Sequence, residues 1–116
     1  MQYAWVALGG AAGSMLRFGL QKWGNGDFPL GTLLVNITGC FLIGLFWALW
    51  SNDANAQKQA LLMTGFCGGF TTFSAFTLEG IQLLNNGRTA AFFIYTGCSI
   101  ICGLGATFVG YKIVSL

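Results

Sequence analysis

The sequence predicts an all-α membrane protein of four transmembrane helices, with almost no material outside the bilayer. Of its 116 residues, 55% are hydrophobic and only 7% are charged, whereas an ordinary soluble domain carries roughly 25% charged residues. So few charged side chains cannot cover the surface of a soluble domain, but lipid can solvate an apolar one. Long apolar runs also alternate with short polar stretches. Together these observations indicate a single transmembrane domain over residues 1–116.

The lengths of the apolar runs set the expected elements. A helix needs about 20 predominantly apolar residues to cross a bilayer. Pro29 stands at the start of the second run, where its missing N–H costs least, and Asn86-Gly87 is typical of a turn before the fourth. Arg17 lies near the end of the first run, from which its side chain is expected to snorkel to the headgroups. The expected helices span residues 3–20, 30–50, 59–84 and 89–111.

Composition also bears on partners and chemistry. A net charge of +2 without a basic cluster gives no sign of nucleic-acid binding. The chain has no histidine, and its four cysteines lie within apolar runs without forming a C-x-x-C pair. A zinc site or a disulfide framework is therefore not indicated. With three acids in total and no paired carboxylates, we do not expect an enzyme.

The basic residues, which normally set membrane orientation, are divided almost evenly between the two sides. One interpretation is a weakly specified topology that something else determines. The other is that the protein inserts in both directions and that the two forms pair as an antiparallel homodimer, equivalent to an inverted repeat. One side would carry Arg17, Lys22 and Arg88, and the other Lys58, Lys112 and the N-terminal amine.

The third run contains the most unusual stretch, GFCGGFTTFSAFT over residues 65–77. Its adjacent glycines and adjacent threonines are poor helix formers in the middle of a span. A break there would free backbone carbonyls, which is tolerated only where they line a cavity or bind an ion. The alternative is an intact helix with a glycine-rich packing groove. The pairs Gly9/Gly13 and Gly65/Gly69 have the spacing that lets helix backbones approach closely.

Several side chains inside the runs have the chemistry to line a path for a small anion. Asn36 carries an uncharged amide that should face protein or water rather than lipid. Phe73 and Phe76 fall on one helix face, and the edges of their rings carry partial positive charge. Tyr95 and Ser99 share a face as well. Taken singly, each of these residues is also compatible with ordinary packing or with a hydrogen bond to its own backbone.

These residues resemble the bacterial Fluc/CrcB family of fluoride channels. The stretch GFCGGFTTFSAF at 65–76 is similar to the central motif of that family. The similarity continues through GGAAGSMLR at 9–17 and GTLLVN at 31–36, in the same order and over essentially the whole chain.

The resemblance implies a dual-topology antiparallel homodimer with two pores, in which the third helix is broken at mid-membrane near residues 68–72. It implies passive export of cytoplasmic fluoride across the bacterial inner membrane. It also implies a structural Na⁺ at the dimer centre, held by the backbone carbonyls of Gly68 and Thr71. The fluoride pore residues that it implies are Asn36, Thr72, Phe73, Phe76, Thr77, Tyr95 and Ser99.

Two further positions stand out against the family pattern. Glu79 lies where members commonly carry an acid, without a role that the resemblance defines. Gly103 replaces a second serine found in some members, so the far end of the polar track is expected to differ here.

A hypothesis from another class is a small four-helix, dual-topology multidrug exporter coupled to protons. That mechanism requires a carboxylate deep in the membrane, typically in the first helix, and residues 3–20 contain none. A non-transporting membrane scaffold is a third possibility, which an unbroken third helix would favour.

Overall fold

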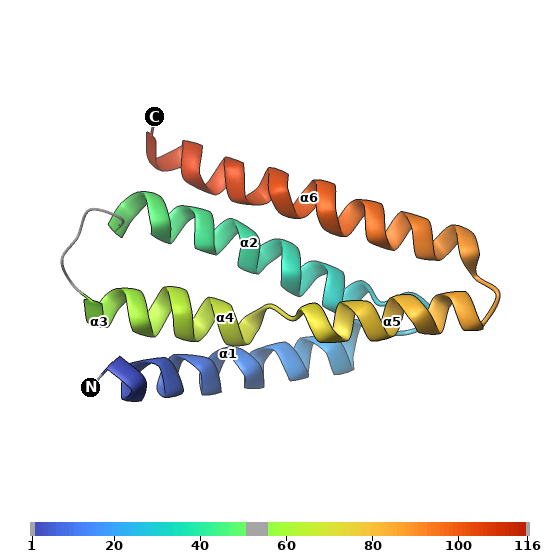
Figure 1. The fold of residues 1–116 in the computed structure, drawn as a ribbon, viewed down its shortest axis with the longest axis horizontal. Coiled ribbons are helices and arrows are strands. Elements are labelled where there is room, and N and C mark those ends of the chain that lie inside the picture. Colours follow the sequence, from blue (N-terminus) through green and yellow to red (C-terminus); the bar gives the residue numbers. More distant parts are fainter. Residues whose placement is uncertain (1, 51–55, 116) are drawn as a thin grey trace.

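The computed structural model describes residues 2–50 and 56–115, which form an all-helical bundle (Figure 1). The third helical rod is composite, because α3, the π-helix η1 and α4 follow one another directly and α5 comes after two further residues. The described chain therefore forms four rods. The elements are α1 (Gln2–Gly24), α2 (Leu30–Trp50), α3 (Ala56–Lys58), η1 (Gln59–Cys67), α4 (Gly68–Phe70), α5 (Phe73–Asn85) and α6 (Thr89–Ser115).

The rods lie side by side in a flat slab of 49 × 32 × 18 Å (Figure 1). From one edge to the other the order is α6, α2, the rod containing α4, and α1, and the start of α1 and the end of α6 lie at the same end of the slab. A slab this thin buries few side chains. The fully buried ones include Thr32, Val35 and Tyr95, whereas Tyr3, Phe73 and Trp23 are more than three-quarters exposed. Both faces of the slab therefore need an apolar environment or another chain.

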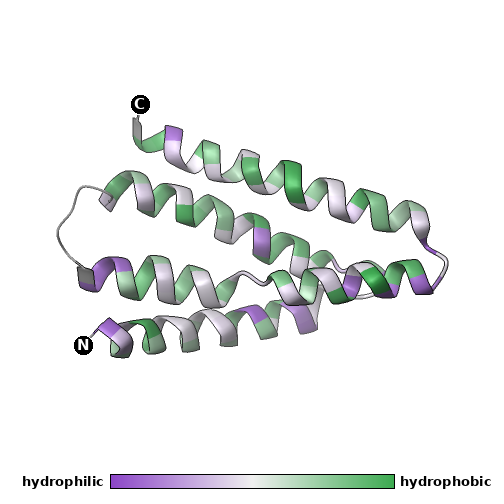
Figure 2. Cartoon of the chain, in the orientation of Figure 1, coloured by the Kyte–Doolittle hydropathy of each residue, from purple (hydrophilic) through white to green (hydrophobic). Residues whose placement is uncertain are grey.

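Three of the helices are long and apolar enough to cross a membrane: Leu30–Trp50, Gln59–Asn85 and Thr89–Val114. α1 is not among them, although its 23 residues provide the length. Its glycines, together with Arg17, Gln21 and Lys22, lower its mean hydropathy, and it is paler than α2 and α6 in Figure 2. A fourth membrane span at α1 stays a prediction.

α1 also runs further than the expected end at residue 20, since it continues through Gly24. Gln21 and Lys22 are good helix formers, and the helix ends only where Gly24, Asn25 and Gly26 follow one another. α6 likewise extends beyond the expected residue 111, to Ser115. Polar residues at the end of an apolar run thus extend a helix that hydropathy alone would end earlier.

Glycines bring the rods into backbone contact. A Cβ on Gly9 would overlap the carbonyl oxygen of Leu61, and a Cβ on Gly13 would overlap that of Phe66. On the other side of the slab, Gly44 of α2 leaves no room for a Cβ against the carbonyl of Thr107. This close approach is what small residues allow between membrane helices, and it holds α1 within reach of the residues that follow η1.

We predict that Gly13→Ala lowers the free energy of unfolding by about 1–3 kcal/mol, because α1 must move away from η1 to admit the methyl group. The matched control is Gly19→Ala on the same helix, where nothing lies within 4 Å of the added Cβ. That change should be neutral or stabilise by up to about 1 kcal/mol. Thermal unfolding in detergent, followed by circular dichroism, measures both. Equal stability of the two variants would contradict the tight contact.

Candidate functional site

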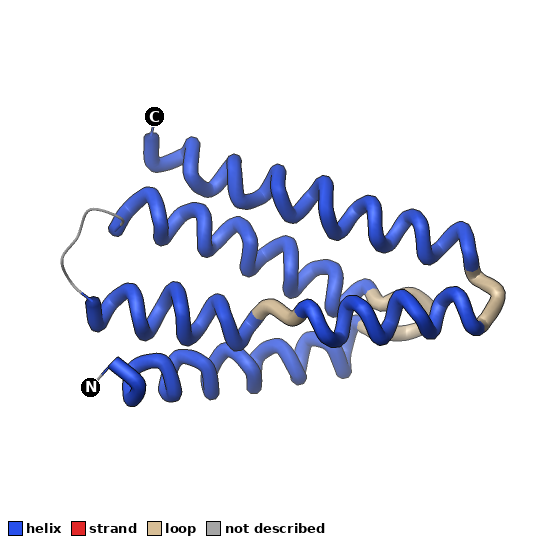
Figure 3. Tube along the Cα trace, viewed as in Figure 1, coloured by secondary structure: helices blue, strands red, loops and turns tan. Residues whose placement is uncertain are grey.

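The rod built from α3 to α5 changes from helical to extended backbone at residues 71 and 72. Thr71 has φ −84° and ψ 157°, and Thr72 has φ −149° and ψ 121°. α4 ends directly before them and α5 begins directly after, as the loop segment between the two helices shows (Figure 3). Two glycines precede and two β-branched residues occupy this point, and neither type favours a helix. Local sequence and backbone geometry therefore agree here.

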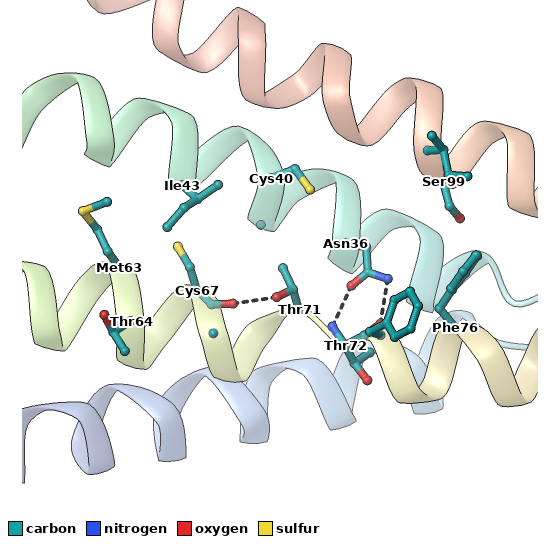
Figure 4. A pocket seen from close by; sticks show the side chains of 14 residues that line it. Asn36, Cys40, Ile43, Met63, Thr64, Cys67, Thr71, Thr72, Phe76 and Ser99 are labelled. Carbon is teal, nitrogen blue, oxygen red and sulfur yellow. Dashed lines mark hydrogen bonds between the residues drawn. The ribbon is translucent and has the colours of Figure 1, made fainter. Parts of the chain in front are cut away.

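Asn36 of α2 replaces the missing helical hydrogen bonds of the extended segment (Figure 4). Its Nδ2 donates to the carbonyl of Thr72 at 3.0 Å, and the N–H of Thr72 donates to its Oδ1 at 2.8 Å. The hydroxyl of Thr72 in turn accepts from the N–H of Ala75 at 3.1 Å and caps α5. One carboxamide thus satisfies both backbone groups of the same residue, and the first turn of α5 begins from a fixed point.

Arg17 of α1 holds the other side of the extended segment. Its Nε donates to the carbonyl of Gly69 at 3.0 Å, and the hydroxyl of Ser14 approaches the same oxygen at 3.4 Å. The side chain therefore turns into the protein, and the expectation that it snorkels to the headgroups is wrong. The physical reason is that α4 ends at this point, so its last carbonyls lack helical donors and attract a cation.

A cavity of about 490 Å³ is lined by residues of α2, η1, α4, α5 and α6. Amide and hydroxyl groups, aromatic rings and sulfur atoms line it, and none of the lining residues that the structure describes is charged. Of the predicted site residues, it brings together Asn36, Gly68, Thr71, Thr72, Phe73, Phe76 and Ser99.

Thr77 and Tyr95 lie outside this cavity. The Thr77 hydroxyl donates to the carbonyl of Ser74 in its own helix at 2.9 Å and is exposed. Tyr95 is fully buried, and its ring lies 5.2 Å from that of Phe76. The two phenylalanines also differ from each other: Phe73 is 78% exposed, whereas Phe76 packs against the buried cluster around Leu33 and Tyr95.

Ser99 contributes a hydroxyl-bearing side chain to the lining of the cavity. Its Oγ is buried and has no hydrogen-bond partner within the part of the chain that the structure describes. In Figure 4 this oxygen points from α6 toward the space beside Phe76. A buried polar atom without a partner requires an explanation, and a bound polar species in the cavity is a simple one. The cavity can thus offer a neutral hydrogen-bond donor without offering a charge.

Sequence reasoning missed a second polar cluster, which surrounds Glu79. Oε1 of Glu79 accepts from the hydroxyl of Thr32 at 2.8 Å and from Nδ2 of Asn25 at 3.1 Å, while Oε2 accepts from the Tyr95 hydroxyl at 3.3 Å. The signal in the sequence is that Glu79 is the only acid within the apolar runs, and such a carboxylate requires donors from neighbouring helices. A polar cavity of about 720 Å³, lined by Asn25, Asp27, Glu79, Gln82, Asn86 and Arg88 among others, adjoins it.

Comparisons with known proteins agree with this architecture. The family model described as "CrcB-like protein, Camphor Resistance (CrcB)" matches residues 4–111. A protein of Rhizobium etli named "Fluoride-specific ion channel FluC" is 46% identical over 114 residues, which cover 93% of this chain and 91% of the relative. Proteins of the same name from Aquifex aeolicus and Nitratidesulfovibrio vulgaris are 46% and 40% identical, over 91% and 90% of this chain and 90% of each relative. The family resemblance is confirmed.

We expect Asn36→Leu to lower the free energy of unfolding by about 1–3 kcal/mol for each backbone group of Thr72 that it leaves unpaired. Leucine has the same number and branching of side-chain heavy atoms as asparagine but neither donates nor accepts. Thr77→Val is the control, because that hydroxyl is exposed and bonds only its own helix, and it should change stability by no more than about 0.5 kcal/mol. Thermal unfolding of the purified protein measures both. If Asn36→Leu is as stable as the control, the pairing does not hold the extended segment.

Proposed function

We propose a fluoride-channel function for this chain, which belongs to the CrcB-like protein family. The chain is a multi-pass membrane protein, and it is an ion channel rather than an enzyme. The observation that carries the proposal is the cavity at residues 71–72, which is largely apolar and contains aromatic rings and the unpartnered Ser99 hydroxyl, without charged lining residues among those described. Its relatives' name, fluoride-specific ion channel, supports the same conclusion.

The chemistry of the cavity suits passive fluoride conduction. Fluoride is small and strongly hydrated, so it enters a narrow path only where donors replace its water. The Ser99 hydroxyl supplies such a donor, and the ring edges of Phe73 and Phe76 supply partial positive charge. Because the described lining carries no fixed cation, the ion is bound weakly enough to leave again. Asn36 and Thr72 belong to the same lining. The Thr77 hydroxyl bonds its own helix and the Tyr95 hydroxyl bonds Glu79, so these two are pore residues by family resemblance alone.

Export follows from passive conduction in a bacterial inner membrane. Fluoride that accumulates in the cytoplasm leaves down its own gradient without an energy source, which would confer fluoride resistance. A proton-coupled multidrug exporter is not favoured, since the relatives are named as fluoride channels and α1 contains no carboxylate that could carry a proton.

Each functional unit is an antiparallel homodimer of two oppositely inserted chains with two pores. The support is the slab itself, which is 18 Å thick and leaves Phe73 and the cavity open on one face. An inverted second copy would cover that face and place its own extended segment across this one. The nearly even distribution of basic residues permits insertion in both directions.

A structural Na⁺ fits between two such copies better than within one. Sodium requires several oxygen ligands, and one chain offers the carbonyls of Gly68 and Thr71 beside the cavity. An added Cβ on Gly68 would meet nothing within 4 Å, so its surroundings can admit an ion. No group of three or more His, Cys, Asp or Glu residues that could hold a metal occurs among residues 2–50 and 56–115. When bound, the ion would supply the positive charge that holds the carbonyls of two copies together.

The direct test is ion flux from liposomes. We expect the purified protein, reconstituted in vesicles loaded with potassium fluoride, to release fluoride rapidly on addition of valinomycin, as read by a fluoride electrode. Vesicles loaded with chloride should release it far more slowly, and protein-free vesicles should release neither. Equal release of the two anions, or no release, would overturn the proposed function.

A variant of the aromatic wall tests how the anion is held. Phe76→Ile keeps an apolar side chain but removes the ring edge, and we expect fluoride flux to fall by up to about tenfold, the scale of an aromatic contact of about 0.5–1.5 kcal/mol. Phe93→Ile on α6 is the control, because Phe93 is exposed and does not line the cavity. Unchanged flux in Phe76→Ile would show that the ring edge does not contribute.

A further inference from the structure

A continuous chain of hydrogen bonds links a cation on α1 to an anion on α5. Arg17 donates through Nη1 to Oε1 of Gln21 at 3.3 Å, and Gln21 donates through Nε2 to the hydroxyl of Thr32 at 3.0 Å. Thr32 donates in turn to Oε1 of Glu79 at 2.8 Å. Every link donates in the same direction, from the guanidinium to the carboxylate, and such aligned chains strengthen each member by polarisation.

Both ends of this chain are fixed to the same composite rod, on opposite sides of the extended segment. At one end Arg17 also donates through Nε to the carbonyl of Gly69, two residues before Thr71. At the other end Glu79 belongs to α5, seven residues after Thr72. The connecting residues Gln21 and Thr32 belong to α1 and α2, which pack against each other. Two neighbouring rods therefore connect α4 to α5.

Such a connection is needed because two extended residues alone do not define the angle between two helices. A shift of α5 by one residue in its helical register would turn its side chains by about 100° about the helix axis. A turn of that size would carry Phe76 away from Tyr95 and from the cavity. Asn36 holds Thr72 itself, and both hydrogen bonds described for its carboxamide end at that residue, before α5 begins.

We propose that Arg17, Gln21, Thr32 and Glu79 form a brace that sets the placement of α5 relative to α4, and that they act on conduction as positioning residues. The inference rests on the proposed fluoride-channel function and assigns a role to the two charges nearest the site. Neither charge attracts or repels the anion directly in this role. Arg17 and Glu79 are instead linked to each other through Gln21 and Thr32, and Arg17 also donates to the carbonyl of Gly69.

The geometry separates positioning from simple charge attraction. A lysine at position 17 keeps the positive charge but has a single nitrogen, so it cannot donate to Gly69 and Gln21 through the fixed fork of a guanidinium. We therefore expect Arg17→Lys to lose fluoride flux almost as severely as Arg17→Gln, by at least about tenfold. Glu79→Gln should lose a similar factor, and the fluoride-to-chloride flux ratio should fall in all three variants.

The central measurement is a double-mutant cycle in reconstituted liposomes. If the brace acts as one unit, Arg17→Gln with Glu79→Gln should conduct within about twofold of the slower single variant rather than losing the product of both factors. Gln21→Leu with Thr32→Val repeats the cycle at the two uncharged links, should a charge variant fail to fold. Lys22→Gln is the matched control, since Lys22 is exposed on the same helix and outside the brace. It should keep the wild-type flux and ratio.

Each outcome decides the proposal. Wild-type flux in Arg17→Lys would show that charge alone matters, and additive losses in both cycles would show that the four residues act independently. Variants that lose thermal stability while keeping the flux ratio would reduce the brace to a purely structural role. Each of these results overturns the proposal while leaving the channel function intact. A wild-type protein that passes no fluoride would instead overturn the channel function itself.

Discussion

The fold depends on how the backbone polar groups at residues 71 and 72 are satisfied. In an apolar environment an unpaired N–H or C=O costs several kcal/mol, so a stretch of extended backbone survives only if other elements supply partners. Asn36 pairs both groups of Thr72, and Arg17 with Ser14 covers the carbonyl of Gly69. The glycine contacts between α1 and η1 serve the same end, because without them Arg17 would not reach that carbonyl.

The charged side chains near the extended segment do not line the cavity. Arg17 and Glu79 lie close to the extended segment, yet each is engaged by partners of the opposite polarity, Gly69 and Gln21 in one case and Thr32, Asn25 and Tyr95 in the other. The described lining of the cavity is left with hydroxyls, amides and rings. A path that binds an anion without trapping it would require such a lining, and here it coexists with nearby charges that are bonded to other partners.

The helical class followed from composition, and the weak helix formers at 68–72 include the two residues whose backbone is extended. What the sequence could not provide were contacts between distant residues. The pairing of Asn36 with Thr72 joins positions 36 residues apart, and no periodicity encodes it. Arg17 was expected to leave the protein because its partner, a carbonyl of the next rod, is not visible in a hydropathy pattern. Thr77 illustrates the same limit, since only coordinates reveal that its hydroxyl bonds its own helix.

The unequal lengths of the rods have a consequence for the surrounding bilayer. At about 1.5 Å per residue, the 27 residues of α6 extend for about 40 Å and the 21 of α2 for about 31 Å, whereas the hydrocarbon layer is about 30 Å thick. α6 must therefore tilt or protrude where α2 need not. Tyr95 of α6 packs on Phe76 of α5, so a change in the tilt of α6 with membrane thickness would bear on the aromatic wall of the cavity.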